Sequence, residues 1–546
     1  MCGIWGLLKS GIIFDKKIVD ACNKIKNRGP DTTIIQIMKN YIICFHRLAI
    51  NDLSCRGNQP FVISIDNYVY TLMINGEIYN HIELEEKYNI TTDSTSDCAI
   101  ILPLFIMLND NFVELNRQLR GEYGMMIIKE NKVDNSIEYF ISTDTLSVRP
   151  IFYFIDSDKH IIGVSSLLSG LSDFSSNVMR LDQGTYIIGK TDFKSYNNII
   201  IEKYHITNYS LLDLKIDQNQ LYKMIIDTLR ESVIIRLNSD RPLGCLLSGG
   251  LDSSLIAAIA AKELSKSGKK LRTFSIGIKG GTDLEYAKIV ADHINSDHTE
   301  FLFTPEEGLS VIDDVINATE TYDITTIRAS VGQFLIAKRI SETTDVKVLL
   351  NGDGADECQM GYIYFYLHPN IDDAYVERNR LVEHIHCYDG LRVDRNISYH
   401  GLEARVPFLD KEFVELYYRI DPKLLVPTKE YMEKHLIRKA FDTLEPELLP
   451  SEILWRKKEA FSDGISSKEK SWYLIVKECY DNKISDMEFM EKERFNNVIP
   501  HCKESYYYRK RFEELFNGNS NVIPGYWLPK WSNTKDPSAR TLNIYV

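Results

Sequence analysis

The second residue of the chain is a cysteine, in the sequence Met1-Cys2-Gly3-Ile4-Trp5. Chain termini are usually mobile and carry little function, so one interpretation is that this cysteine has no special role. The other is that removal of Met1 leaves Cys2 with a free α-amino group of near-neutral pKa beside its own thiol. One residue would then supply both a nucleophile and a base. The first residues alone do not decide between the two.

A second stretch, Leu246 to Ser254, reads LLSGGLDSS and lies between a predicted buried strand and a predicted helix. Glycines let backbone N–H groups approach an anion closely, and the N-terminus of a helix adds positive potential. A tight strand-to-helix turn is the alternative, but it needs fewer special residues than this stretch contains. Neither a GK[ST] nor a GxGxxG pattern is present here. We therefore interpret the stretch as a phosphate-binding loop.

An acidic loop, Asn351 to Glu357, reads NGDGADE and follows the apolar stretch VKVLL. Ligands of open α/β sheets bind beyond the carboxyl ends of the strands, where this loop and the phosphate loop would meet. Alone, the loop is best explained as a solvated turn; with the phosphate loop it indicates a magnesium and substrate site. Thr325–Ser330 and Arg456–Glu459 offer cations that would stabilise charge on phosphates, although each is otherwise an ordinary surface charge.

The dense motifs of the first half are Arg28-Gly29-Pro30-Asp31, Arg47 to Ile50 and Asn75 to Asn80. Asn75 and Gly76 could offer a side-chain amide and a backbone N–H to an oxyanion, as acyl transfer from a thiolate requires. Asn-Gly is also an ordinary hairpin turn, which stays an alternative. Arg47 and Glu77 carry opposite charges that suit the carboxylate and the ammonium group of an amino acid.

Two different patterns surround these motifs. From Ile34 to about Tyr186 the apolar stretches are short, β-rich and separated by turn residues, which is typical of stacked antiparallel sheets. Helices are predicted at Lys16–Asn27 and at Asp97–Leu108, with Asp97 as a candidate cap.

After the polar segment near 190–217, apolar residues recur every fourth position from Leu221 to Leu237, which predicts an amphipathic helix. Strands and helices then alternate as far as VKVLL, which predicts a parallel sheet covered by helices. The predicted strands are RPLGCLL, LRTFSIGI, TEFLFT and VKVLL, and the predicted helices start at Ser253, run over 283–294 and lie near 306–319. Beyond Asp410 the chain is predicted to be mostly helical.

The 546 residues exceed what one core usually fills, so two domains are expected. The net charge of -13 disfavours nucleic acid or an acidic membrane as a partner, although small anions could use a local basic pocket. Ten scattered cysteines without a CxxC pair predict reduced thiols. The sequence shows neither a signal peptide nor a membrane-spanning apolar run, so we expect a cytoplasmic protein.

The loop at Ser248 resembles the SGGxDS loop of the ATP pyrophosphatase family, which splits ATP between its α and β phosphates. The whole chain resembles the glutamine-dependent asparagine synthetases of the B type. The resemblance rests on motifs that occur in the family's order: Cys2, RGPD, NGEIYN, LLSGGLDSS, ETYDITTIRAS, GLEARVPFLD, MEKHLIRKAF and KKEAFSDG.

This resemblance implies a two-domain protein of mixed α/β and α+β class. An N-terminal-nucleophile glutaminase domain with an antiparallel sheet sandwich would span residues 2–195. An ATP-pyrophosphatase-type parallel α/β synthetase domain with a helical C-terminal part would span residues 215–546. ATP would activate L-aspartate as β-aspartyl-AMP, and ammonia that Cys2 releases from L-glutamine would attack it without entering bulk water. The implied cofactor is Mg²⁺, and a homodimer is an open expectation.

The resemblance also implies roles for individual positions. The catalytic set is Cys2, Asn75, Gly76, Arg328, Asp353 and Lys458. The glutamine-binding set is Arg47, Leu48, Ala49, Ile50, Asn51, Asn75, Gly76, Glu77 and Asp97. The ATP-binding set is Leu247, Ser248, Gly249, Gly250, Asp252, Ser253, Ile276, Asn351 and Gly352, and the metal-binding pair is Asp252 and Asp356.

The chain departs from the family at a few positions. Where the family usually reads SGEGSDE, this chain reads NGDGADE, so Asp353 replaces a glutamate thought to receive a proton from the attacking ammonia. One methylene fewer shortens its reach, and general-base catalysis depends first on reach. Asn51 stands where the family usually has an apolar residue, and Ala99 where it often has glutamate. Asp389 matches an aspartate near the substrate.

Two alternatives stay open at this stage. One is an asparagine-synthetase-like amidotransferase that acts on another carboxylate. The other is a nucleotide- or amino-acid-binding regulator that has lost synthesis, for which Asp353 would be the supporting feature. The His384-Ile385-His386-Cys387 stretch is interpreted as ordinary packing or surface residues, because no partner pair has the spacing of metal ligands.

Overall fold

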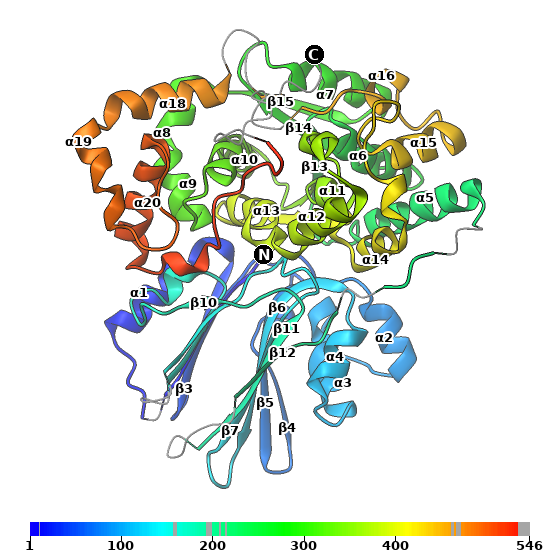
Figure 1. The fold of residues 1–546 in the computed structure, drawn as a ribbon. Helices are drawn as coiled ribbons and strands as arrows, with labels where there is room; N and C mark the ends of the chain where they lie inside the picture. The colour runs from blue at the N-terminus through cyan, green and yellow to red at the C-terminus, as the bar shows by residue number, and fades with distance from the viewer. Residues whose placement is uncertain are drawn as a thin grey trace. The chain divides into compact units, whose positions relative to one another are not determined.

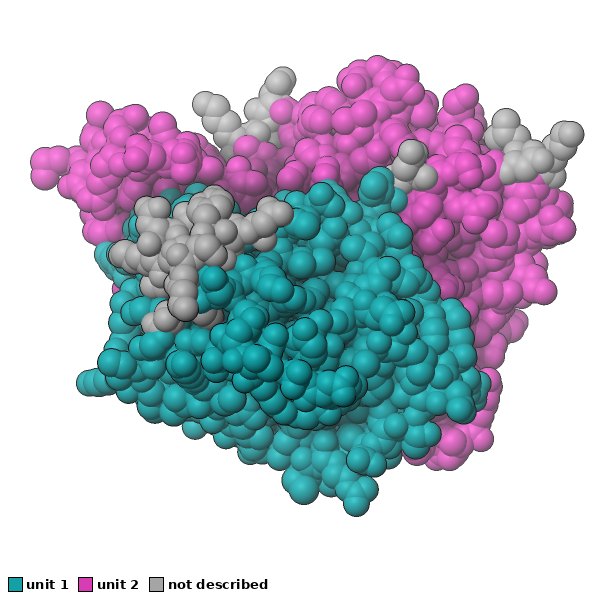
Figure 2. All heavy atoms as spheres, turned by 90° about the horizontal axis from the view of Figure 1, so that it is seen from below, with its two compact units in different colours: residues 1–206, 398–402, 513–522 teal, residues 207–397, 403–512, 523–546 magenta. Residues whose placement is uncertain are grey.

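The computed structural model describes residues 1–9, 11–156, 161–192, 199–206, 209–212, 216–459, 464–465 and 471–532. The chain divides into two compact units, coloured teal and magenta in Figure 2. The first unit contains residues 1–206 together with two later segments, 398–402 and 513–522. The second contains residues 207–397, 403–512 and 523–546.

The first unit is built on two six-stranded antiparallel sheets (Figure 1). One sheet has the order β10-β8-β9-β1-β3-β2, and the other has the order β12-β11-β7-β6-β5-β4. The prediction of antiparallel sheets is confirmed. The strands of the first sheet are β1 (Gly3–Leu8), β2 (Thr32–Ile37), β3 (Tyr41–Arg47), β8 (Phe152–Asp156), β9 (Ile161–Ser165) and β10 (Met179–Arg180). Those of the second are β4 (Phe61–Ile65), β5 (Tyr68–Ile78), β6 (Gly121–Asn131), β7 (Ile137–Thr143), β11 (Thr185–Thr191) and β12 (Ile199–Lys203).

Strand β5 is buried on both faces because its side chains alternate between two cores. Leu72 and Ile74 pack in a cluster with the helical residues around Phe105. Met73, between them, packs in a second cluster with Ile4 of β1 and residues of both sheets. The two sheets therefore share a hydrophobic core, and the second sheet also supports the helices on its outer side.

The helices of this unit are α1 (Lys16–Lys24), α2 (His81–Tyr88), α3 (Ile101–Met107) and α4 (Phe112–Gln118). Helix α1 is shorter than predicted and is followed by a 3-10 turn at Lys26–Arg28. The prediction that Asp97 caps a helix is wrong. Asp97 instead begins a 3-10 turn, Asp97–Ile100. Its carboxylate accepts a hydrogen bond from the N–H of Ile78 at 2.6 Å, which joins it to the end of β5.

The second unit has a five-stranded parallel sheet of order β15-β14-β13-β16-β17, which confirms the predicted parallel sheet (Figure 1). Its strands are β13 (Leu243–Leu246), β14 (Arg272–Gly277), β15 (Asp297–Leu302), β16 (Val348–Leu350) and β17 (Glu403–Arg405). The helices between them are α5 (Gln218–Ile235), α6 (Leu251–Ser265), α7 (Thr282–His293), α8 (Pro305–Ser310), α9 (Ile312–Thr319) and α10 (Ile324–Thr343). The helix predicted near 306–319 is thus two helices.

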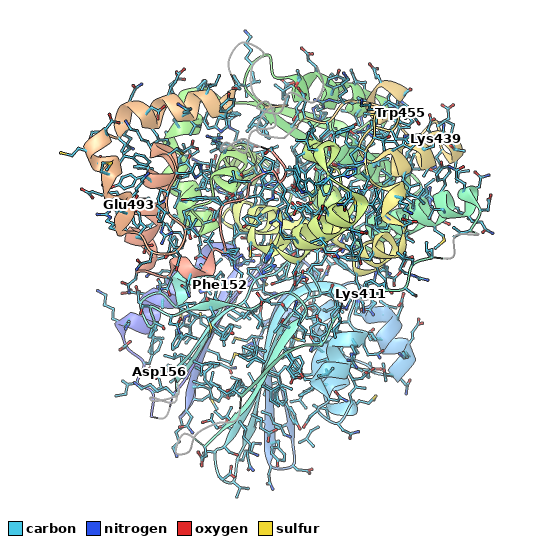
Figure 3. All side chains as sticks on the ribbon, viewed as in Figure 1. Phe152, Asp156, Lys411, Lys439, Trp455 and Glu493 are labelled. Carbon is cyan, nitrogen blue, oxygen red and sulfur yellow. The ribbon has the colours of Figure 1, made fainter. Side chains whose placement is uncertain are left out.

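The later part of this unit is mostly helical, as predicted. Its helices are α11 (Ala355–Cys358), α12 (Ile371–Glu383), α13 (Asp389–Ser398), α14 (Lys411–Arg419), α15 (His435–Leu444), α16 (Ser451–Leu454), α18 (Trp472–Lys483), α19 (Asp486–Phe489) and α20 (Lys503–Phe516). The ends of two of them, residue 398 of α13 and residues 513–516 of α20, are counted in the first unit. Trp455, labelled in Figure 3 with Lys439 of α15, follows α16 and has its ring 5.7 Å from that of His435. Within the described ranges, every helix is too short or too polar to cross a membrane.

Candidate functional site

The thiol of Cys2 is held between the start of β1 and the residue that follows β3. The backbone N–H of Leu48 donates to the Cys2 Sγ at 3.4 Å, and the Nε of Arg28 donates to the Cys2 carbonyl at 2.9 Å. Arg28 belongs to the predicted RGPD motif, and Asp31 of the same motif accepts the N–H of Ala49 at 2.9 Å. Two sequence motifs that lie apart in the chain therefore fix the position of the cysteine.

Asn75 and Gly76 lie inside β5, where they pair with Gly124 and Tyr123 of β6, so the alternative of a hairpin turn is excluded. A Cβ at Gly76 would lie 2.2 Å from the carbonyl oxygen of Glu122, which explains the glycine. The side chain of Asn75 is fully buried, and neither its Oδ1 nor its Nδ2 has a hydrogen-bond partner among the described residues. A buried amide rarely stays unpaired, so this side chain is available to a ligand.

Arg47, Glu77 and Asp97 come together around the chain segment that follows β3. The Arg47 guanidinium donates to the Asn58 Oδ1 at 2.7 Å and to the Ser54 carbonyl at 2.8 Å, which fixes it against this segment.

The side chain of Asn51, a departure from the family, joins the two acids. Its Nδ2 lies 2.7 Å from the Glu77 Oε2 and 3.2 Å from the Asp97 Oδ1. The structure thus brings together the predicted glutamine-binding residues, with Leu48, Ala49 and Ile50 buried alongside.

The second unit contains a pocket at the carboxyl ends of β13, β14 and β16, where the two predicted loops meet. Its wall is completed by Arg328 and Gln333 of α10, Asp389 and Arg392 of α13, and Trp527 of the C-terminal segment. Gly249 is the one predicted ATP-binding residue that does not line it. The predicted residues that do are Leu247, Ser248, Gly250, Asp252, Ser253, Ile276, Arg328, Asn351, Gly352, Asp353, Asp356 and Lys458.

The phosphate loop is shaped by its own hydroxyls and glycines. The Oγ atoms of Ser248 and Ser253 lie 3.0 Å apart, and the N–H of Gly250 donates to the Ser248 Oγ at 3.3 Å. Gly249 has φ +70°, and a Cβ there would lie 2.4 Å from the backbone N of Ala287 in α7. Gly249 is therefore required by the close approach of α7, while its neighbours face the pocket.

Two lysines stand at the two acids predicted to hold magnesium. The Nζ of Lys434 lies 2.5 Å from the Asp252 Oδ2 and 2.6 Å from the Asp356 Oδ1, and Lys458 also contacts Asp356. Burial opposes ionisation of Asp356, but the two ammonium groups outweigh it and hold the pKa of this carboxyl well below its usual range. Lys434 lies in the quoted motif MEKHLIRKAF, yet sequence reasoning gave it no role.

The fit of these residues to a metal ion is partial. No group of three or more metal-ligating side chains occurs within the described part of the chain. The Asp252 Oδ1 is buried without a hydrogen-bond partner, so it is available as a ligand. Magnesium usually takes only one or two carboxylates and completes its shell with waters and substrate phosphates, which this arrangement allows.

Asp353 belongs to a buried network on one wall of the pocket. Its carboxylate contacts Arg392 and accepts the Gln333 amide at 3.3 Å. Arg392 also donates its Nε to the Asp389 Oδ1 at 3.1 Å. Burial raises the pKa of Asp353 in spite of Arg392. Arg392 was missed by the sequence analysis, and its one signal is that it follows Asp389 by one helical turn.

The other oxygen of Asp389 meets a tyrosine and a second acid. The Tyr362 hydroxyl lies 2.7 Å from both the Asp389 Oδ2 and the Glu357 Oε1. Burial, followed by the charge of Asp389, raises the pKa of Glu357 well above its usual range. Glu357 is thus a buried acid of the pocket wall that sequence reasoning did not single out.

The other predicted cations also line the pocket, although part of the sequence block around them is not described. Arg328 lies on α10 and lines the pocket, where its guanidinium is paired with Glu504 of α20. Lys457 and Arg456 line the pocket beside Lys458. Residues 460–463 of the KKEAFSDG block lie outside the described residues. In the described chain the His384–Cys387 stretch joins no metal-binding cluster.

Comparison with known proteins covers the whole chain. A family model for asparagine synthase matches residues 224–383 and 379–534, and a model for the glutamine amidotransferase domain matches residues 1–200. The proteins called asparagine synthetase [glutamine-hydrolyzing] from Bos taurus and Homo sapiens are 38% identical to this chain over 572 aligned residues. The protein of the same name from Gallus gallus is 37% identical over 571 residues. Each alignment covers 100% of this chain and 99% of the relative. The chain therefore belongs to the asparagine synthase family and begins with a glutamine amidotransferase domain.

Proposed function

We propose that this protein is a glutamine-hydrolysing asparagine synthetase. It converts L-aspartate, ATP and L-glutamine into L-asparagine, AMP, pyrophosphate and L-glutamate. The observation that carries this proposal is the pocket of the second unit, which joins the SGGLDS loop to a wall of alternating acids and cations. Family membership over the full chain length supports the same reaction.

In the first unit, Cys2 is the nucleophile that attacks the side-chain amide of glutamine after Met1 is removed. The Asn75 side chain and the Gly76 N–H stabilise the oxyanion, since the Asn75 amide is buried and has no partner among the described residues. Arg47 binds the glutamine α-carboxylate, while Glu77 and Asp97 bind its α-ammonium group. When the C–N bond of the amide breaks, ammonia is released and a thioester between Cys2 and the glutamyl group remains. Water then hydrolyses this thioester and releases glutamate.

In the second unit, the phosphate loop and the lysines bind the triphosphate of ATP. The backbone N–H groups at the start of α6 and the ammonium groups of Lys434 and Lys458 offset the charge of the departing pyrophosphate. Asp252 and Asp356 would hold Mg²⁺, which supplies charge neutralisation to the phosphates when bound. In the structure both acids are paired with lysine. When ATP is bound, the lysines would contact the triphosphate instead, which would leave the two carboxylates available to Mg²⁺.

Aspartate is expected against the wall formed by Asp389 and Arg392. Arg392 is a planar cation suited to a carboxylate, and the Asp389, Glu357 and Tyr362 group is suited to an α-ammonium group. The β-carboxylate would then attack the α-phosphorus of ATP to give β-aspartyl-AMP and pyrophosphate. Asp353 takes a proton as ammonia attacks this intermediate.

We propose further that ammonia passes between the two chemistries without release to bulk water, because protonation would remove its nucleophilicity. A domain boundary between residues 195 and 215, a homodimer and a cytoplasmic location are proposals that rest on sequence. The ten free cysteines of the structure are compatible with the last of these.

The test of this function is adenylation measured by itself. With ATP, aspartate and labelled pyrophosphate, the protein should incorporate label into ATP, and only when aspartate is present. Exchange with a different carboxylate and not with aspartate would favour an amidotransferase for another substrate. ADP as the nucleotide product would contradict the adenylating mechanism. No exchange with any carboxylate would favour a regulator that has lost synthesis.

A further inference from the structure

Helix α20 is connected to the pocket of the second unit by a buried ion pair. Glu504, in the first turn of α20, accepts hydrogen bonds from Arg328 of α10 with both carboxylate oxygens. The Arg328 Nε lies 2.9 Å from Oε1, and its Nη2 lies 2.5 Å from Oε2. This two-bond arrangement fixes the plane of the guanidinium as well as its position.

Arg328 is part of the pocket wall, whereas its partner Glu504 is not. The side chains of both residues are almost completely buried, at 4% and 2% exposed. A charge pair in such a place is expensive to desolvate and is rarely the most stable way to fill a core. Its retention in this position is better explained by orientation of the arginine than by stability.

Glu504 is itself held in place. The Tyr508 hydroxyl, one helical turn further along α20, donates to the Glu504 Oε1 at 3.0 Å. Helix α20 is bound to the region before α10 by Arg509, whose guanidinium lies 4.5 Å from the ring centre of Tyr322. It is bound to α9 by the Tyr507 hydroxyl, which donates to Asp313 at 2.9 Å. The carboxylate is thus presented to Arg328 from a fixed support.

We propose that Glu504 is a positioning residue for adenylation, which orients the Arg328 guanidinium toward the phosphates in the pocket. The inference rests on the proposed function, in which Arg328 stabilises charge that develops on ATP. A flexible arginine would spend part of its time away from that charge. A fixed one is ready without reorganisation when the β-carboxylate attacks.

The proposal is tested by a double-mutant cycle on aspartate-dependent exchange of pyrophosphate into ATP. Glu504→Gln keeps the size of the side chain and removes its charge. We expect kcat for exchange to fall by about tenfold or more, with KM for ATP changed by less than about threefold, because the interaction is made with the transition state. In an Arg328→Lys background, which lacks the planar two-bond fork, Glu504→Gln should add little further loss.

A matched control uses another arginine of the same helix. Arg339 of α10 pairs with Glu307 of α8 through one nitrogen, its Nη2, which lies 2.7 and 2.9 Å from the two carboxylate oxygens, and neither residue lines the pocket. Glu307→Gln should leave exchange within about twofold of the parent, as expected for a more exposed pair. A loss equal to that of Glu504→Gln would show that any disturbance of α10 suffices, and would contradict the proposal.

Two further outcomes are decisive. The same fold-loss from Glu504→Gln in the parent and in the Arg328→Lys background would show that Glu504 does not act through Arg328. If Glu504→Gln does not fold, the cycle is run with Glu504→Asp, which keeps the charge and withdraws it by one methylene, and the same non-additivity is expected. Absence of aspartate-dependent exchange in the parent protein would instead contradict the proposed function itself.

Discussion

Replacement of Asp353 by asparagine separates two roles that the structure allows for this residue. As a general base, its carboxylate takes a proton from ammonia as the amide bond forms. As a positioning group, it holds Arg392, which it contacts, in place for the aspartate substrate. Asp353→Asn removes the charge and the basicity but keeps the size of the side chain.

The size of each effect follows from the contacts. Loss of a general base lowers a rate by about 10² to 10⁴. Loss of a buried charge partner costs about 3–5 kcal/mol of stability when the other charge is left alone. Arg392 is not left alone here, because the Asp389 Oδ1 stays 3.1 Å from its Nε. We therefore expect a loss of stability below that range, and a rate loss of about 10² or more if Asp353 is the base.

The assay uses ammonia as the nitrogen donor, so that Cys2 plays no part, and measures two rates. If Asp353 is the base, asparagine formation falls by about 10² or more while aspartate-dependent pyrophosphate exchange stays within about threefold. Asp353→Glu, which restores the family's residue, keeps both rates. Asp410→Asn is the control for the loss of an internal charge. It breaks a buried ion pair in which the Asp410 Oδ2 lies 2.7 Å from the Arg236 Nη1, and neither residue lines the pocket.

Two results would refute this reasoning. Asparagine formation near the parental rate would remove Asp353 from the catalytic residues. An equal fall in exchange and in asparagine formation would place its action before ammonia arrives, on aspartate binding through Arg392.

Three further predictions concern other parts of the protein. Cys2→Ala should abolish glutamate formation and leave asparagine formation from ammonia within about twofold, by amino-acid analysis; persistent glutamate release would contradict Cys2 as nucleophile. Asn51→Leu should raise KM for glutamine about tenfold with kcat little changed, since the amide that joins Glu77 and Asp97 is lost; a lower KM would show that Asn51 competes with glutamine instead. Burial raises the pKa of Asp323 from its usual 3.8 to about 6, so this carboxyl binds its proton more tightly in the folded protein than in the unfolded chain. Relative to Asp323→Asn, the free energy of unfolding of the parent should fall by up to about 3 kcal/mol as pH rises from about 4 to about 6, in urea titrations; a rise would contradict the burial argument.

The sequence predicted the elements that have strong local patterns. The short, β-rich apolar stretches of the first half and the fourfold spacing from Leu221 gave the correct element types, because a buried strand and an amphipathic helix each leave a pattern in the local sequence. Glycine-rich and acidic loops at strand ends predicted the pocket, since parallel strands bring their carboxyl ends to one edge. Motif order then identified the chemistry of the two halves.

What sequence reasoning missed depends on contacts between distant residues. The segment around Asp97 has the composition of a capped helix, but its carboxylate is taken by the N–H of Ile78 on a neighbouring strand. Lys434 reaches Asp252 from 182 positions away, and Glu504 reaches Arg328 from 176. Nothing in the local spacing of these residues indicates such partners, because they are set by how helices pack around the sheet.

The most direct test of the central claim is one reaction with ATP, L-aspartate and L-glutamine labelled with ¹⁵N in its side-chain amide, followed by mass analysis of all products. The account predicts AMP, pyrophosphate and glutamate in equal amounts, with the ¹⁵N in the side-chain amide of asparagine. Formation of ADP, or release of glutamate with no labelled asparagine, would contradict it.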